Sequence, residues 1–351
     1  MEKKAKFRDC GLAYLLCFVF VVCVSFVVTS IISSVATTEG VPASDVANRE
    51  WVSYLNTFLS EFVFILVFFV IVFIRKDKGF AKTYRLKFKF DLKIFLSVFV
   101  LGIFVMLCSL NMTNLVNKVF SFVSPVALTD SIGVGLDGFG KFLLAVLLMA
   151  ILPCICEELV FRGIIYNGLR QRYSYKISIL LSTVMFVLMH MSIYKSFYQA
   201  ILGVVLGLLM FETGTIFYGI VFHFANNFSI LFFNYVFGAN KVFEFVNWGF
   251  KEIAISVLIF AIGFAVVFLF FKWLSRYVKR ENSSFELKER GFELEESSGP
   301  LDVSFCIDDS KLSYEQKILF NDKKNEGFVL LILSVAFGLV LWSFNSFGGF
   351  L

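Results

Sequence analysis

The chain has 351 residues, a net charge of +5 and 58% hydrophobic residues, which come in long blocks. This composition excludes a soluble globular protein and predicts an all-α fold, a polytopic bundle of membrane helices. The charge is uneven, because residues 281–326 hold 12 of the 27 acidic residues and only 6 of the 32 basic ones. The other basic residues cluster beside the ends of apolar stretches, which indicates membrane orientation and no nucleic-acid partner.

Nine apolar stretches are long enough to cross, or nearly cross, a hydrocarbon core of ~30 Å. They are residues 11–36, 51–74, 93–112, 141–169, 177–191, 196–212, 215–236, 252–272 and 327–345. The first follows "MEKKAKFR" and is too long for the apolar part of a cleaved signal peptide, so we expect a signal anchor. The stretch at 177–191 is the shortest of the nine.

Basic loops follow the second, fourth and eighth stretches, in "RKDKGFAKTYRLKFK", "RQRYSYK" and "KWLSRYVKR". The alternate loops, such as "TTEGVPASDVANRE", contain few Lys or Arg residues. The positive-inside rule therefore predicts a multi-pass protein of the cell membrane, with its N-terminus in the cytoplasm and its C-terminus outside.

We expect five parts along the chain. They are N-terminal transmembrane helices (1–139), a four-helix core with the polar residues (140–237), a further transmembrane helix (238–280), an acidic cytoplasmic linker (281–326) and a C-terminal transmembrane helix (327–351). The seven cysteines are odd in number and lie mostly within apolar stretches. They predict small packing side chains and no disulfide framework.

Three charged side chains, Glu157, Glu158 and Arg162, interrupt the fourth apolar stretch in "CEELVFRG". A charge at bilayer depth costs at least ~2.5 kcal/mol, so such residues face a bundle interior or a wet cavity and have partners. Glu158 and Arg162 are i,i+4 neighbours and can neutralise each other. Glu157 points about 100° away and is left for another partner. Pro153 is expected to loosen or kink the helix one turn earlier.

Both histidines of the chain, His190 and His223, also lie in apolar stretches, in "FVLMH" and "HFANN". At 1.5 Å per residue, Glu157 and His190 lie ~20 Å from the cytoplasmic ends of their helices, and Asn227 lies at a similar depth. Three helices thus bring polar groups to one level. Asn227 shares a helix face with His223, and Phe186 lies one turn from His190, where it can fix the ring.

A carboxylate beside an imidazole in a cavity of low dielectric suits a general base that acts on water. A His and Asn pair on the facing helix can donate hydrogen bonds to a developing oxyanion. Together these groups predict hydrolysis of an acyl or peptide bond at the membrane.

The three stretches "EELVFR", "FVLMH" and "HFANN" resemble the EExxxR, FxxxH and HxxxN motifs of the CPBP intramembrane proteases. That family includes CAAX-prenyl endopeptidases and bacterial proteins linked to bacteriocin processing and self-immunity. The resemblance covers roughly residues 140–237. Three ordered motifs on successive helices make it specific, whereas EExxxR alone would be a weak signal.

The resemblance implies a role for each matching residue. Glu157 would be the catalytic base that activates water, with His190 assisting it. Glu158 and Arg162 would maintain the shape and charge balance of the site. His223 and Asn227 would stabilise the oxyanion. The substrate would be a membrane-associated protein or peptide, and its identity is left open.

Two questions stay open at the level of sequence. Family members are labelled metalloproteases, and Glu157, His190 and His223 would complete a zinc site with an open water position, although no HExxH helix is present. A mechanism without a metal cofactor is the other reading. The same buried groups also suit a proton-coupled transporter, although no pair of broken helices points to one. A catalytically idle immunity or scaffold protein is the third possibility.

Overall fold

A computed structural model of the chain describes residues 6–86, 88, 90–124, 135–238, 249–281 and 314–347. Every regular element among these residues is a helix, and no strand occurs in them, which confirms the predicted all-α class. The described cysteines are all free thiols, namely Cys10, Cys17, Cys23, Cys108, Cys154 and Cys156. Cys306 lies outside the described residues.

The α-helices are α1 (Phe7–Glu39), α2 (Ala43–Ala47), α3 (Glu50–Arg75), α4 (Phe80–Thr83), α5 (Leu92–Phe120), α6 (Phe139–Val146), α7 (Leu152–Glu158), α8 (Asn167–Leu169), α9 (Tyr175–Met189), α10 (Ile193–Thr213), α11 (Phe217–Phe237), α12 (Phe250–Glu281) and α13 (Tyr314–Phe347). Two π-helices, η1 (Leu147–Ile151) and η2 (Leu159–Tyr166), join α6, α7 and α8 into one continuous rod.

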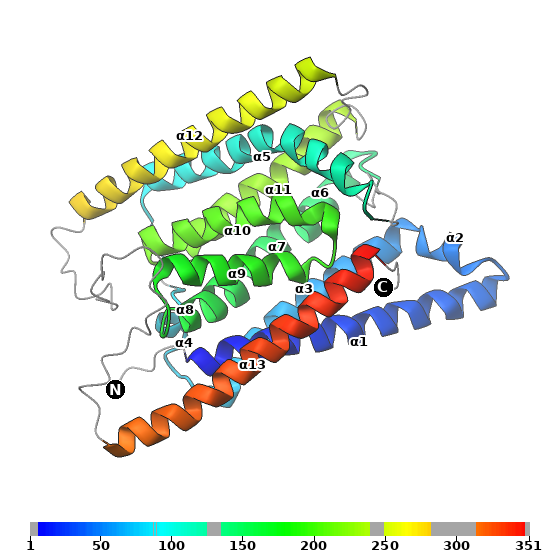
Figure 1. The fold of residues 1–351 in the computed structure, drawn as a ribbon. Coiled ribbons are helices and arrows are strands. Elements are labelled where there is room, and N and C mark those ends of the chain that lie inside the picture. Colours follow the sequence, from blue (N-terminus) through cyan, green and yellow to red (C-terminus); the bar gives the residue numbers. More distant parts are fainter. Residues whose placement is uncertain are drawn as a thin grey trace.

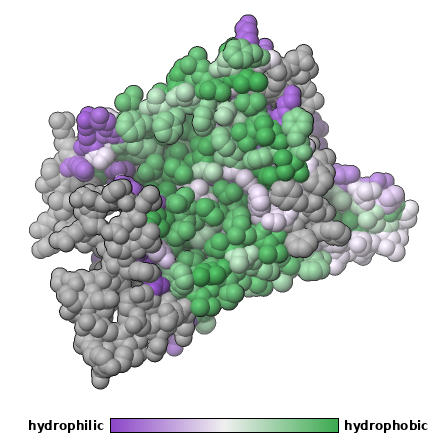
Figure 2. Space-filling view, in the orientation of Figure 1, coloured by the Kyte–Doolittle hydropathy of each residue, from purple (hydrophilic) through white to green (hydrophobic). Residues whose placement is uncertain are grey.

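Seven of these helices are long and apolar enough to cross a membrane, the rod from Phe139 to Leu169 counting as one. Two shorter apolar helices, Tyr175–Met189 and Gly327–Ser343, occupy the remaining two predicted stretches. The surface in Figure 2 is broadly hydrophobic across the middle of the bundle, and hydrophilic residues gather toward its ends. The chain is therefore a multi-pass membrane protein.

The rod α6–η1–α7–η2–α8 lies inside the bundle. Helix α1 packs against α3, α13 and η2, while α5 packs against α11 and α12 (Figure 1). Helices α3, α9, α10 and α11 all contact the rod, and α9 and α10 form a hairpin. The most polar part of the rod is thereby shielded from lipid by helices on several sides.

Two features differ from the sequence-based expectation. Helix α13 begins at Tyr314, within the stretch predicted to be linker, because "YEQKILFNDKKNEG" is rich in helix-forming residues although too polar to register as membrane sequence. The rest of the predicted linker, residues 282–313, lies outside the described residues. In addition, the two π-helical segments around α7 were not predicted, apart from the loosening expected at Pro153.

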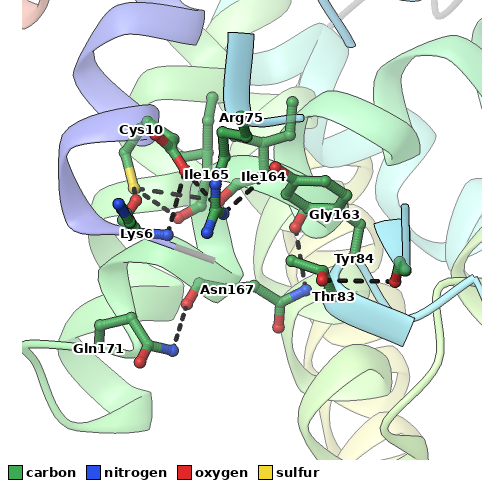
Figure 3. Close-up of polar contacts among 12 residues, drawn as sticks. Lys6, Cys10, Arg75, Thr83, Tyr84, Gly163, Ile164, Ile165, Asn167 and Gln171 are labelled. Carbon is green, nitrogen blue, oxygen red and sulfur yellow. Dashed lines mark hydrogen bonds and ion pairs between the residues drawn. The ribbon is translucent and has the colours of Figure 1, made fainter. Parts of the chain in front are cut away.

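The carbonyl groups of η2 are satisfied by side chains from neighbouring segments (Figure 3). Asn167 donates from Nδ2 to the carbonyl oxygens of Arg162 and Gly163, each at 3.0 Å. The Cys10 thiol of α1 donates to the carbonyl oxygen of Ile165 at 3.3 Å. Cys10 thus hydrogen-bonds in addition to packing, and it fixes α1 against η2.

Candidate active site

The ion pair between Glu158 and Arg162 lies at the centre of the rod. Arg162 Nη1 is 2.8 Å from Glu158 Oε1, and both side chains are almost fully buried. Arg162 also donates from Nη2 to the carbonyl oxygen of Gly203 at 3.4 Å, and its guanidinium lies over the Phe186 ring, 4.8 Å from the centroid. The guanidinium therefore has a counter-charge, a carbonyl acceptor and an aromatic face within a low-dielectric interior.

Two glycines allow close contacts between helices around this ion pair. A Cβ atom on Gly219 of α11 would lie 2.8 Å from Glu158 Oε2. A Cβ atom on Gly203 of α10 would lie 2.8 Å from Cγ2 of Thr183 on α9. Larger residues at either position would push α10 or α11 outward, so these glycines set how closely the site is enclosed.

His223 of α11 lies against both glutamates. Its Nε2 is 3.9 Å from Glu157 Oε2, and its Nδ1 is 3.4 Å from Glu158 Oε1. All three side chains are buried, Glu157 being 7% and His223 3% exposed. Three atoms of this group have no hydrogen-bond partner among the described residues, namely Glu157 Oε2, Glu158 Oε2 and His223 Nδ1. Buried polar atoms of this kind mark a place where water or a substrate group can bind.

His190 directly follows the last residue of α9, and a hydrogen bond to the backbone defines its tautomer. Its Nδ1 lies 2.9 Å from the carbonyl oxygen of Phe186, and a carbonyl can only accept, so Nδ1 carries the proton. In the neutral form of this ring, Nε2 carries the lone pair and can accept a hydrogen bond. The Phe186 ring centroid is 4.9 Å from that of His190 and 6.3 Å from that of His223. Phe186 therefore contacts His190 as expected and also lies near His223.

Asn227 contacts the rod at a different point from His223. Its Nδ2 donates to the carbonyl oxygen of Met149 in η1 at 3.3 Å. Pro153 has no N–H, so it cannot supply the donor that an α-helix would offer to Met149. Asn227 thus satisfies a carbonyl freed by the proline, and one N–H of its amide is engaged there.

The sequence analysis did not predict that two further charged residues, Glu61 and Lys195, lie near the site. Glu61 of α3 is buried, its Oε2 has no hydrogen-bond partner among the described residues, and it interacts electrostatically with Glu157. Lys195, in the first turn of α10, interacts electrostatically with both Glu157 and His190. Glu61 was detectable as a carboxylate within an apolar stretch. Lys195 was placed in a loop between two stretches, which concealed it.

The three residues considered as zinc ligands are not gathered into one ligand set. Glu157 and His223 approach each other, but no group of three or more His, Cys, Asp or Glu side chains in the described part of the chain has the arrangement of a metal site. In the described part of the chain, these side chains as they stand do not fit a zinc ion.

Three comparisons with known proteins bear on this region. Searches of curated proteins and of solved structures gave no significant match. A family model described as "Type II CAAX prenyl endopeptidase Rce1-like" matches residues 139–229, which are 91 of the 351 residues and run from the start of α6 into α11. All the residues of the three motifs fall within the match. This segment is therefore similar to the Rce1-like type II CAAX prenyl endopeptidases, a protease family, which agrees with the resemblance of the three motifs.

Proposed function

We propose that the chain is an intramembrane endopeptidase that hydrolyses a peptide bond of a membrane-associated protein or peptide. The observation that carries the proposal is the approach of the His223 imidazole to within 3.9 Å of the Glu157 carboxylate, inside the segment matched by the protease family. Glu157 lies twelve residues from the end of its rod at Leu169, ~18 Å along the axis. Catalysis would therefore occur well within the hydrocarbon region.

In the proposed reaction, Glu157 accepts a proton from a water molecule, and the resulting hydroxide adds to the carbonyl carbon of the substrate. The lone pair on His190 Nε2 accepts a hydrogen bond that orients this water. His223 and the second N–H of the Asn227 amide donate to the oxyanion of the tetrahedral intermediate. The carbon–nitrogen bond then breaks, and the leaving amine takes the proton held by Glu157, which restores the carboxylate.

Glu158 and Arg162 do not take part in proton transfer in this scheme. Their ion pair places a carboxylate oxygen 3.4 Å from His223 Nδ1, so it contributes negative charge beside the second imidazole. The resemblance to proteins of bacteriocin immunity stays a prediction, and the substrate remains defined only by its chemistry, a peptide bond that reaches the membrane interior.

The proposal is tested with Glu157→Gln, which keeps the size of the side chain and removes the base. We expect loss of cleavage by at least about 100-fold, the usual contribution of a general base, with insertion and thermal stability unchanged. The substrate is found by trapping membrane proteins on this variant and identifying them by mass spectrometry. Glu39→Gln, which changes an exposed carboxylate at the end of α1, is the matched control.

Full cleavage of the trapped protein by Glu157→Gln would overturn the proposed mechanism. Proton-coupled uptake of a solute into proteoliposomes, lost in Glu157→Gln while no peptide bond is cut by the unaltered protein, would instead identify a transporter.

A further inference from the structure

The last helix of the chain contacts the turn that joins α9 and α10. Trp342 of α13 donates from Nε1 to Ser196 Oγ at 3.0 Å, and Asn345 donates from Nδ2 to the carbonyl oxygen of Met191. Figure 1 shows the end of α13 beside the connection between these two helices. Helix α13 lies outside residues 139–229, so the family match does not include these contacts.

The turn itself carries strain. Met191 has a φ of 46°, the left-handed region that side chains other than glycine rarely adopt. His190 immediately precedes it, and Lys195 follows within the first turn of α10. A strained conformation of this kind persists only where surrounding contacts hold it. The Asn345 amide binds the Met191 carbonyl directly, so it is one such contact.

Ser196 links the Trp342 indole to the turn. Its hydroxyl accepts from the indole N–H and donates to the carbonyl oxygen of Ser192 at 2.7 Å. A hydroxyl that accepts and donates in this way is fixed in orientation, and each bond polarises the next. The relay runs from α13 through Ser196 to the residue that precedes α10.

Helix α13 is well placed to act as a support because α1 fixes it at two levels. A Cβ atom on Gly11 would lie 2.7 Å from the backbone nitrogen of Leu331, and one on Gly338 would lie 2.8 Å from the Phe18 ring. Helix α1 in turn contacts α9, since Tyr14 Oη donates to the carbonyl oxygen of Met185 at 2.7 Å. The close packing of α1 with α13 thus extends to the helix that directly precedes His190.

We propose that Trp342, Ser196 and Asn345 are positioning residues that hold the α9–α10 turn, and with it His190, in place beside Phe186. The catalytic unit then includes α13, an element far along the chain from the three motifs. The kinetic test of this inference rests on the proposed protease function. A spectroscopic test does not depend on activity.

The kinetic test compares Trp342→Phe, which removes the indole N–H and keeps an aromatic ring, with Trp273→Phe, which changes a partly exposed tryptophan of α12. Both are made in the full chain. We expect kcat to fall about two- to twelvefold in Trp342→Phe, the net contribution of one hydrogen bond, while KM stays within about twofold. Ser196→Ala should have the same effect, and the double variant should be no slower than either single one. Additive losses would contradict the relay.

The spectroscopic test uses the fact that the chain has two histidines. Nitrogen-15 NMR of histidine-labelled protein in detergent gives separate ring signals for His190 and His223. We expect Trp342→Phe and Asn345→Ala to shift the His190 signals and to leave those of His223 in place. Unchanged His190 signals together with an unchanged kcat would overturn the positioning role. A shifted His190 signal in a protein that cleaves nothing would uphold the positioning role and reject the protease function.

Discussion

Arg162 illustrates how a single guanidinium is accommodated at membrane depth. Its charge is matched by Glu158 at 2.8 Å, and its planar face lies on Phe186. Removing one partner of a buried ion pair leaves the other charge buried and unpaired, which destabilises the fold. Removing both partners can leave the stability nearly unchanged. We therefore expect the loss of one partner to reduce stability by more than the loss of both.

Glu158→Gln leaves the Arg162 guanidinium without a counter-charge, so we expect a loss of ~3–5 kcal/mol in the free energy of unfolding. The double variant Glu158→Leu with Arg162→Met should recover most of that loss, because both charges are gone. Thermal unfolding in detergent measures both effects. Equal stability of Glu158→Gln and the unaltered protein would show that Arg162 does not need the Glu158 carboxylate as its counter-charge.

Asn227 is expected to serve both the fold and the reaction. In Asn227→Ala the half-buried Met149 carbonyl loses its donor, which costs about 1 kcal/mol. The same change removes a proposed oxyanion donor, so cleavage should fall as well. Glu157→Gln should reduce cleavage alone. The melting temperature and the initial rate of cleavage, measured for both variants, separate the effect on the fold from the effect on the reaction. An Asn227→Ala variant of unaltered stability would argue against the contact with η1.

Among individual residues, the sequence predicted the contacts that depend on spacing within one helix. The Glu158–Arg162 pair and the contact of Phe186 with His190 follow from i,i+4 geometry and are found. The interaction of Asn227 with Met149 was not predictable, because it requires knowing which carbonyl Pro153 frees and which helix faces it.

Helices α9 and α10 form the element on which enclosure of the site depends. Gly203 faces Thr183, and Gly207 faces Ile179, with Cβ positions 2.8 Å and 3.0 Å from the nearest side-chain atoms. The four-residue spacing of these glycines predicts such close contact. The carbonyl oxygen of Gly203 also accepts a hydrogen bond from Arg162 Nη2 at 3.4 Å, so this position contacts both α9 and η2.

Gly203→Ala should force α9 and α10 apart, since its methyl group would overlap Thr183. Overpacking of this kind costs ~1–3 kcal/mol, and the displaced carbonyl should also weaken cleavage. Gly140→Ala is the matched control, because a Cβ atom there meets nothing within 4 Å. Thermal unfolding and cleavage rates of both variants test this, and equal behaviour of the two would mean that the hairpin is not tightly packed at Gly203.

The positions of the long helices followed from hydropathy alone, because a membrane span needs about 20 apolar residues. The π-helices did not. Pro153 follows η1, and the side chains that bind carbonyl groups of η2 include the Cys10 thiol of a distant helix, a contact that helix spacing does not reveal. The early start of α13 was missed for a simpler reason. Hydropathy identifies the part of a helix that is apolar enough to lie in lipid. It does not show how far the helix continues outside the membrane.

For the whole molecule, the alternation of helices places α4 and α8, beside the basic loops, at the end of the bundle where α1 begins (Figure 1). Helix α13 ends at the opposite end. With the positive-inside rule this arrangement predicts a cytoplasmic N-terminus and an external C-terminus.

Reporter fusions test this orientation directly. Alkaline phosphatase joined after Leu351 should be active, and green fluorescent protein at the same position should be dark, whereas the reverse is expected for fusions within residues 76–91. Reporters that place both points on one side of the membrane would contradict the predicted topology and would require an even number of crossings.

The depth of Glu157, ~18 Å from the end of its rod, limits what a substrate can be. An extended chain advances ~3.3 Å per residue, so about five or six substrate residues must leave water before the scissile bond reaches the carboxylate. Each of them brings an amide and a carbonyl that lipid cannot solvate. A segment that is already helical would have to unwind to expose the bond, so polypeptides with glycine or proline near the cut are the ones that can be processed readily.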